Sequence, residues 1–284
     1  MTAPFVEGFE IVKLWDKDRG AAEAAAKILN SSPEVCESFE QVSDDVDLVF
    51  IADCNGDGHD HLKLATPGLK KGIPTFVDKP FAHSLTDVLA MLKLSKEYDA
   101  PIMSLSILQT VPETRLFARR LEEIGGARFG TIQGLGTNRA AMIHTICIAL
   151  TVFGSDVESV RALTGPNHTS IHLDWGGQPN RPLHGVMINC DTGRGWHCSM
   201  YLSAFGPGGR GVIYNQGIGD WEFPRGSAEI LRLIKKMVET GKSQGPVNQM
   251  IEAVAIADAA DAAIKVSATQ LLEIVKPVPN LNLK

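Results

Sequence analysis

Two short apolar runs, at residues 47–52 and 73–77, constrain the fold of this chain more than any other feature. The first run is almost entirely apolar after Asp47, as expected for a strand covered on both faces of a sheet, and the second is expected to be the next strand. Residues 60–71 separate them, with apolar residues at helical spacing and Gly72 placed to end the helix. A strand, a helix and a second strand in this order predict a parallel sheet.

The same alternation continues on both sides of these runs. We expect further strands at residues 10–15 and 101–105, and helices at residues 21–29, 85–98 and 113–124. Ser84 or Thr86 can cap the helix that begins at residue 85. Residues 1–124 are therefore predicted to form a domain with a doubly wound parallel sheet.

The pattern changes after Gly125 and Gly126. Strand-like segments separated by glycine and proline turns come next, and then two helical segments. The strands are expected at residues 128–133, 159–163, 185–189, 196–202 and 211–215, and the helices at residues 228–240 and 248–266. We expect residues 125–284 to form an α+β domain with an open, mostly antiparallel sheet. At about 150 residues per domain, a chain of 284 residues corresponds to roughly 1.9 domains, so two domains are expected.

Composition excludes several classes of protein. The chain has 27 Lys and Arg against 33 Asp and Glu, a net charge of −6, so we expect no binding to nucleic acid or to an anionic membrane. The longest uncharged apolar stretch, residues 140–155, contains His144 and is too short for a membrane span. No secretory signal is visible, and the five cysteines form no CxxC pair. We expect a reduced, cytoplasmic protein.

Polar side chains come directly after three of the predicted strands, where parallel sheets bind their ligands. They are Asp16, the segment at residues 53–61, and the run Asp78-Lys79-Pro80. An acidic side chain after the second strand of a nucleotide-binding fold can accept hydrogen bonds from ribose hydroxyls. The ammonium group of Lys79 can stabilise an alkoxide. Taken alone, Asp16 also fits a helix cap and Lys79 a surface lysine.

Two other motifs are weaker. Residues 53–58 begin like a calcium loop, but the twelfth position is Leu64 instead of a glutamate, so we reject calcium. His59 and His61 are candidate metal ligands, but no third ligand stands at a suitable spacing, and we expect no metal site. Residues 134–139 (GLGTNR) are similar to part of a dinucleotide fingerprint but lack its third glycine and the βαβ context.

Two segments together resemble the Gfo/Idh/MocA (glucose–fructose oxidoreductase / inositol dehydrogenase) family. The first begins at His61 and ends at Asp78-Lys79-Pro80. It resembles the family's histidine at the start of a helix and its Glu-Lys-Pro strand end, with Asp78 in place of the glutamate. The second is the apolar helix that carries His144, similar to the histidine-bearing helix at the start of the family's second domain. The helix at residues 248–266 is similar to the family's last helix.

The resemblance implies a Rossmann domain followed by a domain whose open sheet joins the subunits of a homo-oligomer. It implies hydride transfer between a hydroxyl of a sugar or polyol and NAD or NADP. Lys79 would stabilise or help protonate the substrate oxygen, and His144 would be the acid–base group. The expected cofactor-binding residues are Asp16, Asn55, Asp78, Lys79 and Pro80. Asp16 disfavours the 2′-phosphate of NADP, whereas Lys17 and Arg19 favour it, so both cofactors stay open.

The sequence departs from the family pattern at its start and at its histidine helix. Family members begin with a strand and a Gly-x-Gly-x-x-Gly loop that holds the cofactor pyrophosphate, whereas we expect this chain to begin just before the second strand. The lacking strand is central, so its neighbours should be unpaired unless another element fills the gap. Ala140 and Cys147 stand where the family commonly has carboxylates. The alternative function is a non-catalytic relative that acts as a binding or interaction module.

Overall fold

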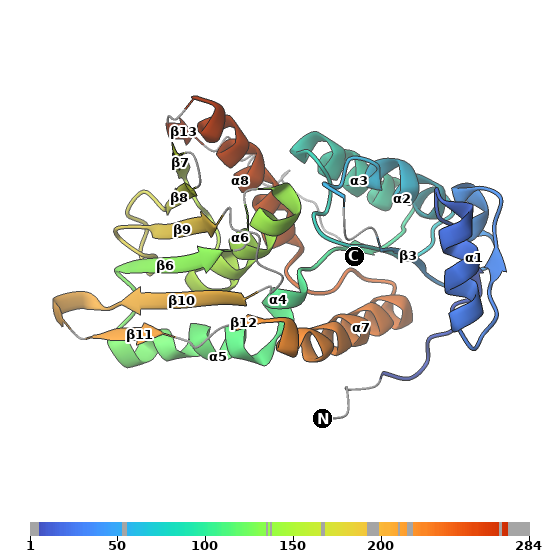
Figure 1. Cartoon of the computed structure of the whole chain (residues 1–284), viewed down its shortest axis with the longest axis horizontal. Coiled ribbons are helices and arrows are strands. Elements are labelled where there is room, and N and C mark those ends of the chain that lie inside the picture. The colour runs from blue at the N-terminus through green and yellow to red at the C-terminus, as the bar shows by residue number, and fades with distance from the viewer. Residues whose placement is uncertain are drawn as a thin grey trace.

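The computed structural model describes residues 6–52, 56–134, 136, 138–165, 168–191, 199–209, 211–214, 218–266 and 269–271. Figure 1 shows two parts side by side, with the N-terminal strands and helices on the right and a larger sheet on the left. Helix α8 (Val247–Val266) lies between the two parts and contacts helix α3 (Leu85–Glu97) of the first part and strand β7 (Ser159–Gly165) of the second. The predicted fold class is confirmed.

Short parallel strands and three helices form the N-terminal part. The strands are β1 (Lys13–Leu14), β2 (Glu34–Val35), β3 (Val49–Ile51), β4 (Thr75–Val77) and β5 (Ile102–Met103). The helices are α1 (Arg19–Ile28), α2 (His61–Lys70) and α3, with a 3₁₀ turn at Phe39–Ser43. Ser84 caps α3, because its hydroxyl accepts a hydrogen bond from the Asp87 N–H. All residues of β4 are buried, as the apolar run predicts.

These strands form two separate parallel sheets, β1–β2 and β3–β4–β5. Within the described part of the chain, β1 pairs with β2 alone and β3 with β4 alone, so each of these two strands has one unpaired edge. Apolar side chains beside this break are partly exposed: Phe50 of β3 by 45%, and Ile11 and Val12, which precede β1, by 44% each. This agrees with the expectation that the neighbours of the family's first strand are unpaired.

The second part contains one large sheet and most of the helices. Its helices are α4 (Ile107–Thr110), α5 (Pro112–Arg120), α6 (Arg139–Phe153), α7 (Phe223–Thr240) and α8, with 3₁₀ turns at Leu121–Ile124, Pro207–Gly209 and Asp220–Glu222. Its strands are β6 (Phe129–Gly134), β7, β8 (His168–Asp174), β9 (Val186–Asp191), β10 (Ser199–Phe205), β11 (Val212–Tyr214), β12 (Ile218–Gly219) and β13 (Thr269–Leu271).

The strand order of the large sheet is β11-β10-β6-β9-β8-β7-β13, with β12 paired to β10. Of these pairs only β6–β9 is parallel, so the sheet is mostly antiparallel, as expected. Helices α6 and α8 pack against each other and against this sheet. Helix α6 is apolar nearly all round and almost wholly buried, which suits a helix enclosed between a sheet and other helices. No helix in the described residues combines the length and the apolar run needed to cross a bilayer.

Candidate active site

The carboxyl ends of β3, β4 and β5 lie at one edge of their sheet, because the three strands are parallel and in register. The chain leaves β4 as Asp78-Lys79-Pro80, and Asp78 N donates a hydrogen bond to Ile51 O across the sheet at 2.9 Å. Ser104, the residue after β5, donates its hydroxyl to Asp78 O at 3.4 Å. The half-buried Lys79 therefore emerges where open parallel sheets bind their ligands.

His61 anchors the turn that carries Lys79. Its side chain is fully buried, and its Nδ1 lies 2.8 Å from Pro80 O and 3.3 Å from Phe81 O. Carbonyl oxygens only accept hydrogen bonds, so Nδ1 carries the proton and donates it. Among the described residues, Nε2 of His61 has no hydrogen-bond partner. His61, a candidate metal ligand by its sequence, thus holds the strand-end turn in place.

His144, on helix α6, lies at the same edge of the β3–β4–β5 sheet, which we call the small sheet. Its ring is 7% exposed, and its Nδ1 lies 2.7 Å from the hydroxyl of Ser106, the residue before α4. Burial, and next the positive charge of Lys79, lower the pKa of His144 from 6.5 to about 3. Lys79 is thus close enough to act on His144 electrostatically, and the imidazole is neutral at pH 7. The two residues expected to be catalytic are brought together.

Ser106 is held by contacts on both its hydroxyl and its backbone N–H, and its hydroxyl can accept a hydrogen bond from one tautomer of His144. The Ser106 hydroxyl accepts the Leu108 N–H at 3.2 Å, and Ser106 N donates to Gln109 Oε1 at 3.0 Å. A hydroxyl oxygen has two lone pairs, so it can accept a second bond from His144 Nδ1–H. In that tautomer the Nε2 lone pair of His144 can accept a proton from a ligand.

Cys147 lies one turn after His144 on α6 and is fully buried. Its Sγ donates to Met250 Sδ at 3.9 Å. Burial raises the pKa of the Cys147 thiol, and the charge of Lys79 offsets this only in part. A protonated thiol is neither a base nor a good nucleophile, so Cys147 does not replace a carboxylate chemically.

The other expected cofactor residues are less well placed. Asp16 is exposed, and its Oδ1 accepts the Asp18 N–H at 2.7 Å, a contact that also fits the helix-cap alternative. Asn55 lies outside the described residues. Pro80 is buried and its carbonyl is bound by His61, while Asp78 continues the sheet through its backbone. The cofactor roles of these residues stay predictions.

An ion pair with a buried guanidinium connects the two parts of the molecule beside this edge. The guanidinium of Arg139, the first residue of α6, contacts Asp258 of α8 and lies 3.4 Å from Asp261 Oδ2. It also donates to His83 O at 2.5 Å, and Asp258 accepts the Leu85 N–H at 3.0 Å. Sequence reasoning missed this group, because Arg139 and Asp258 are 119 residues apart and no sequence pattern links them.

The glycine-rich run at residues 134–139 has a packing role. Gly134 ends β6 and pairs with Cys190 of β9. A Cβ on Gly134 would lie 2.8 Å from Thr145 Oγ1, so the missing side chain lets α6 approach the sheet. The strand before this run belongs to the mostly antiparallel sheet and not to a βαβ unit. The interpretation of this run as a dinucleotide loop gains no support.

Residues 3–105 match the family model described as "Oxidoreductase family, NAD-binding Rossmann fold", that of Gfo/Idh/MocA proteins. This part of the chain is a Gfo/Idh/MocA Rossmann domain. The candidate active site uses Lys79 from this domain and His144 from the sequence beyond it. No curated protein sequence matches the chain.

Solved structures resemble nearly the whole chain, including the residues beyond the Gfo/Idh/MocA domain. Myo-inositol 2-dehydrogenase from Lactobacillus plantarum is 14% identical, with 95% of this chain and 94% of that chain covered and a TM-score of 0.78. Myo-inositol dehydrogenase from Lactobacillus casei, in complex with NAD(H) and myo-inositol, is 15% identical over 93% and 89%, at 0.77. A probable dehydrogenase from Thermotoga maritima is 16% identical over 92% and 91%, at 0.75. At these identities the likeness shows the fold alone.

Proposed function

We propose that this protein is an NAD(P)-dependent oxidoreductase that transfers a hydride between a sugar- or polyol-like hydroxyl and the nicotinamide. The observation that carries the proposal is the meeting of Lys79 and His144 at the carboxyl edge of the small sheet, with Lys79 close enough to lower the pKa of His144. The family match of residues 3–105 and the dehydrogenases among the similar structures support it.

The chemistry needs two groups at one oxygen, and Lys79 and His144 are the residues that we propose for them. A hydroxyl that loses hydride must also lose its proton, which the neutral His144 imidazole can accept. The Lys79 ammonium stabilises the negative charge that develops on the same oxygen. The nicotinamide, when bound, supplies the hydride acceptor. Ser106 fixes the ring of His144 through the 2.7 Å contact, so we propose it as a positioning residue.

The described residues fit the two ends of a dinucleotide better than its middle. Lys79 and His144 suit the nicotinamide end, and Asp16, just after β1, suits the ribose of the adenosine half. Arg19 already pairs with Glu23 at 2.9 Å and Glu37 at 2.7 Å, which makes it a weaker partner for a 2′-phosphate. We therefore favour NAD over NADP. The described residues include no glycine-rich loop for the pyrophosphate.

Titration of the purified chain with NADH and NADPH, followed by fluorescence transfer from tryptophan, tests the proposal. We expect saturable binding with a preference for NADH, and NAD⁺-dependent oxidation of a member of an inositol and aldose panel. Lys79→Ala should abolish turnover while leaving the chain folded. Binding followed by undiminished turnover in Lys79→Ala would contradict the assigned chemistry.

A second candidate function is a non-catalytic relative that binds a polyol or a partner. Two observations favour it: the described residues lack a pyrophosphate loop, and residue 140 is Ala where the resemblance leads us to expect a carboxylate. A well-folded chain that binds neither nucleotide but binds inositol by calorimetry would establish this alternative. We also propose a reducing, cytoplasmic location, since Cys36, Cys147 and Cys190 are buried free thiols.

We further propose that the open face of the large sheet joins subunits of a homo-oligomer. Directly paired residues share a face, so the strand register places one row of side chains on this face across five strands. The row contains Tyr201, Gln133, Asn189, Ser170 and Leu163. Its ends, Tyr201 and Leu163, are 51% and 71% exposed, so a partner subunit could bury apolar area at both ends of the row.

Light scattering after size-exclusion chromatography tests this assembly. We expect a dimer or larger species that Tyr201→Lys with Leu163→Lys converts to a monomer. Lys96→Glu, on the exposed surface of α3, is the control that leaves the assembly intact. A monomeric wild-type chain would contradict the assembly without bearing on the catalytic proposal.

A further inference from the structure

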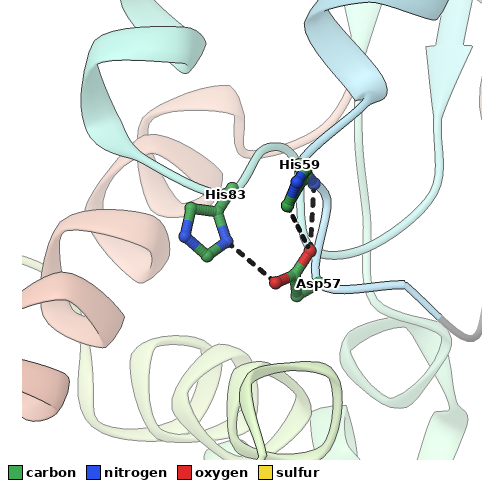
Figure 2. A group of neighbouring side chains, drawn as sticks. All are labelled: Asp57, His59 and His83. Atoms are coloured by element: carbon green, nitrogen blue, oxygen red, sulfur yellow. Dashed lines mark hydrogen bonds and ion pairs between the residues drawn. The ribbon is translucent and has the colours of Figure 1, made fainter.

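Three potential metal ligands meet on the loops at the ends of β3 and β4. Figure 2 shows the carboxylate of Asp57 between the imidazole rings of His59 and His83. Asp57 Oδ1 lies 3.1 Å from His59 Nδ1, and Asp57 Oδ2 lies 3.2 Å from His83 Nδ1. The three ligand atoms all lie within 4.8 Å of one another. Adjacent ligand atoms of a tetrahedral zinc ion lie about 3.4 Å apart, given bonds of about 2.0–2.1 Å. The two carboxylate–imidazole distances are close to this spacing.

The backbone holds the two ligand-bearing loops together. Gly58 O accepts hydrogen bonds from His83 N at 3.0 Å and from His61 N at 3.3 Å. Gly58 has a φ of +81°, and a Cβ there would lie 2.8 Å from the Ala82 carbonyl carbon. Only glycine permits this close contact, so the spacing of Asp57 and His83 is fixed by the backbone as well as by their side chains.

Charge around the cluster also favours a cation. Three carboxylates lie in or near the cluster. Asp57 is one of its ligands, and Asp261 of α8 is near enough to His83 for their charges to interact. Asp258 lies beside Asp261. The described cations in this group are Arg139, which pairs with Asp258 and Asp261, and Lys265, whose charge also acts on Asp261. The carboxylates Asp57, Asp258 and Asp261 outnumber these two cations, which leaves an excess of negative charge.

The donor set indicates the kind of ion. Two imidazole nitrogens and one carboxylate suit a first-row divalent ion such as Zn²⁺, whereas Mg²⁺ prefers oxygen ligands alone. The three side chains are 64% (His59), 47% (His83) and 46% (Asp57) exposed, so coordination positions would face solvent. Three protein ligands with an open position are the pattern of exchangeable or catalytic sites, not of closed structural ones.

We propose that Asp57, His59 and His83 bind a divalent transition-metal ion of the Zn²⁺ class. The ion joins the loop after β3 to the turn after β4, four residues beyond Lys79, and so braces the turn that carries Lys79. This replaces the expectation that the chain has no metal site. That expectation arose because His83 is 24 residues from His59 and its approach depends on the fold.

Metal titration of the full chain tests the site without any cofactor or substrate. The protein, prepared without a histidine tag and stripped with EDTA, is titrated with Zn²⁺ by calorimetry and with Co²⁺ by visible absorption. We expect one ion per chain, with Co²⁺ bands that report nitrogen ligation. Excess Mg²⁺ should not displace Zn²⁺. A wild-type chain that binds no Zn²⁺ would overturn the proposal.

Substitutions test whether the ion binds at these three residues. His59→Asn and His83→Asn should each weaken Zn²⁺ binding at least tenfold, whereas His184→Asn, at an exposed histidine between β8 and β9, should bind as the wild type does. Zn²⁺ should raise the Tm of the wild type and His184→Asn but not of the double variant His59→Asn/His83→Asn. If His83→Asn does not fold, the more exposed His59 carries the test. Equal affinity in wild type and His59→Asn would refute the site.

Discussion

His144 Nδ1 and the Ser106 hydroxyl lie 2.7 Å apart, although the two residues are 38 positions apart and belong to different parts of the fold. Ser106 comes shortly after β5 of the small parallel sheet, and His144 lies on α6, which packs against the large sheet. This contact orients the imidazole at the edge where Lys79 emerges. The proposed chemistry depends on it.

Removal of the Ser106 hydroxyl should slow turnover without preventing cofactor binding. A neutral hydrogen bond contributes about 1 kcal/mol, so we expect Ser106→Ala to lower kcat roughly fivefold or more. KM for the cofactor should change little, because Ser106 contacts the histidine and not the nucleotide. Ser106→Thr keeps the hydroxyl and should restore most of the activity. A fall in cofactor affinity with unchanged kcat would contradict the positioning role.

The pKa of His144 should respond to Lys79. Lys79 and burial both lower it, to about 3, so the ring should not titrate between pH 5 and 8 in the wild type. Lys79→Met removes the neighbouring charge and should raise the pKa of His144, but not to its ordinary value, because the ring stays buried. Imidazole NMR resonances across this pH range measure the change. Lys96→Met, on α3, is the control that should have no effect.

Glu252 of α8 should make stability depend on pH near neutrality. Its carboxylate accepts the Val157 N–H at 2.8 Å, and burial raises its pKa from 4.5 to about 7. Between these pH values the folded chain keeps a proton that the unfolded chain releases, so the free energy of unfolding falls as pH rises. The total loss above pH 7 is on the order of 3 kcal/mol.

Glu252→Gln should remove this dependence. Relative to the wild type, the variant gains stability between pH 5 and pH 8 by up to that amount, although its amide cannot accept every bond that the carboxylate accepts. Denaturant unfolding at each pH measures the difference, with the exposed Glu239→Gln of α7 as control. A parallel pH profile for Glu252→Gln and wild type would show that Glu252 is ionised normally.

The Arg139–Asp258 pair should show strong coupling. Arg139→Met removes the guanidinium that pairs with two carboxylates. Asp258→Asn leaves a guanidinium whose side chain is 7% exposed with Asp261 as its remaining carboxylate partner among the described residues. Each change should cost roughly 1–3 kcal/mol, discounted because Asp258 is 35% exposed. The double variant should lose less than the sum of the two. Additive losses in denaturant unfolding would show that the pair contributes no coupling.

The sequence predicts the strands and helices whose signal is local. The run at 73–77 became β4, Ser84 proved to be the cap of α3, and Lys79 and His144 meet as the resemblance implies. Strand β2 was missed because two residues carry too little pattern to be recognised. Strand β8 was missed because its open face is polar, which leaves no apolar run even though Ile171 and Leu173 are buried.

The sequence pattern does not predict contacts between distant segments. Ser106 stands at the end of a predicted strand, a position that could have marked it, but its partner on α6 is known only from the fold. His83 gave no signal as a third ligand, since it approaches Asp57 only because the loops after β3 and β4 are neighbours. The same holds for Arg139 and Asp258, which connect the two parts of the molecule.

The central claim is that Lys79, His144 and a nicotinamide cofactor share one site. The most direct test monitors the His144 imidazole resonances of the full chain during titration with NADH, with tryptophan fluorescence transfer reporting the bound fraction in parallel. The account predicts that the His144 signals shift in step with binding and that Lys79→Met changes this shift. Saturable NADH binding that leaves the His144 signals unmoved in the wild type would place the cofactor elsewhere and contradict the account.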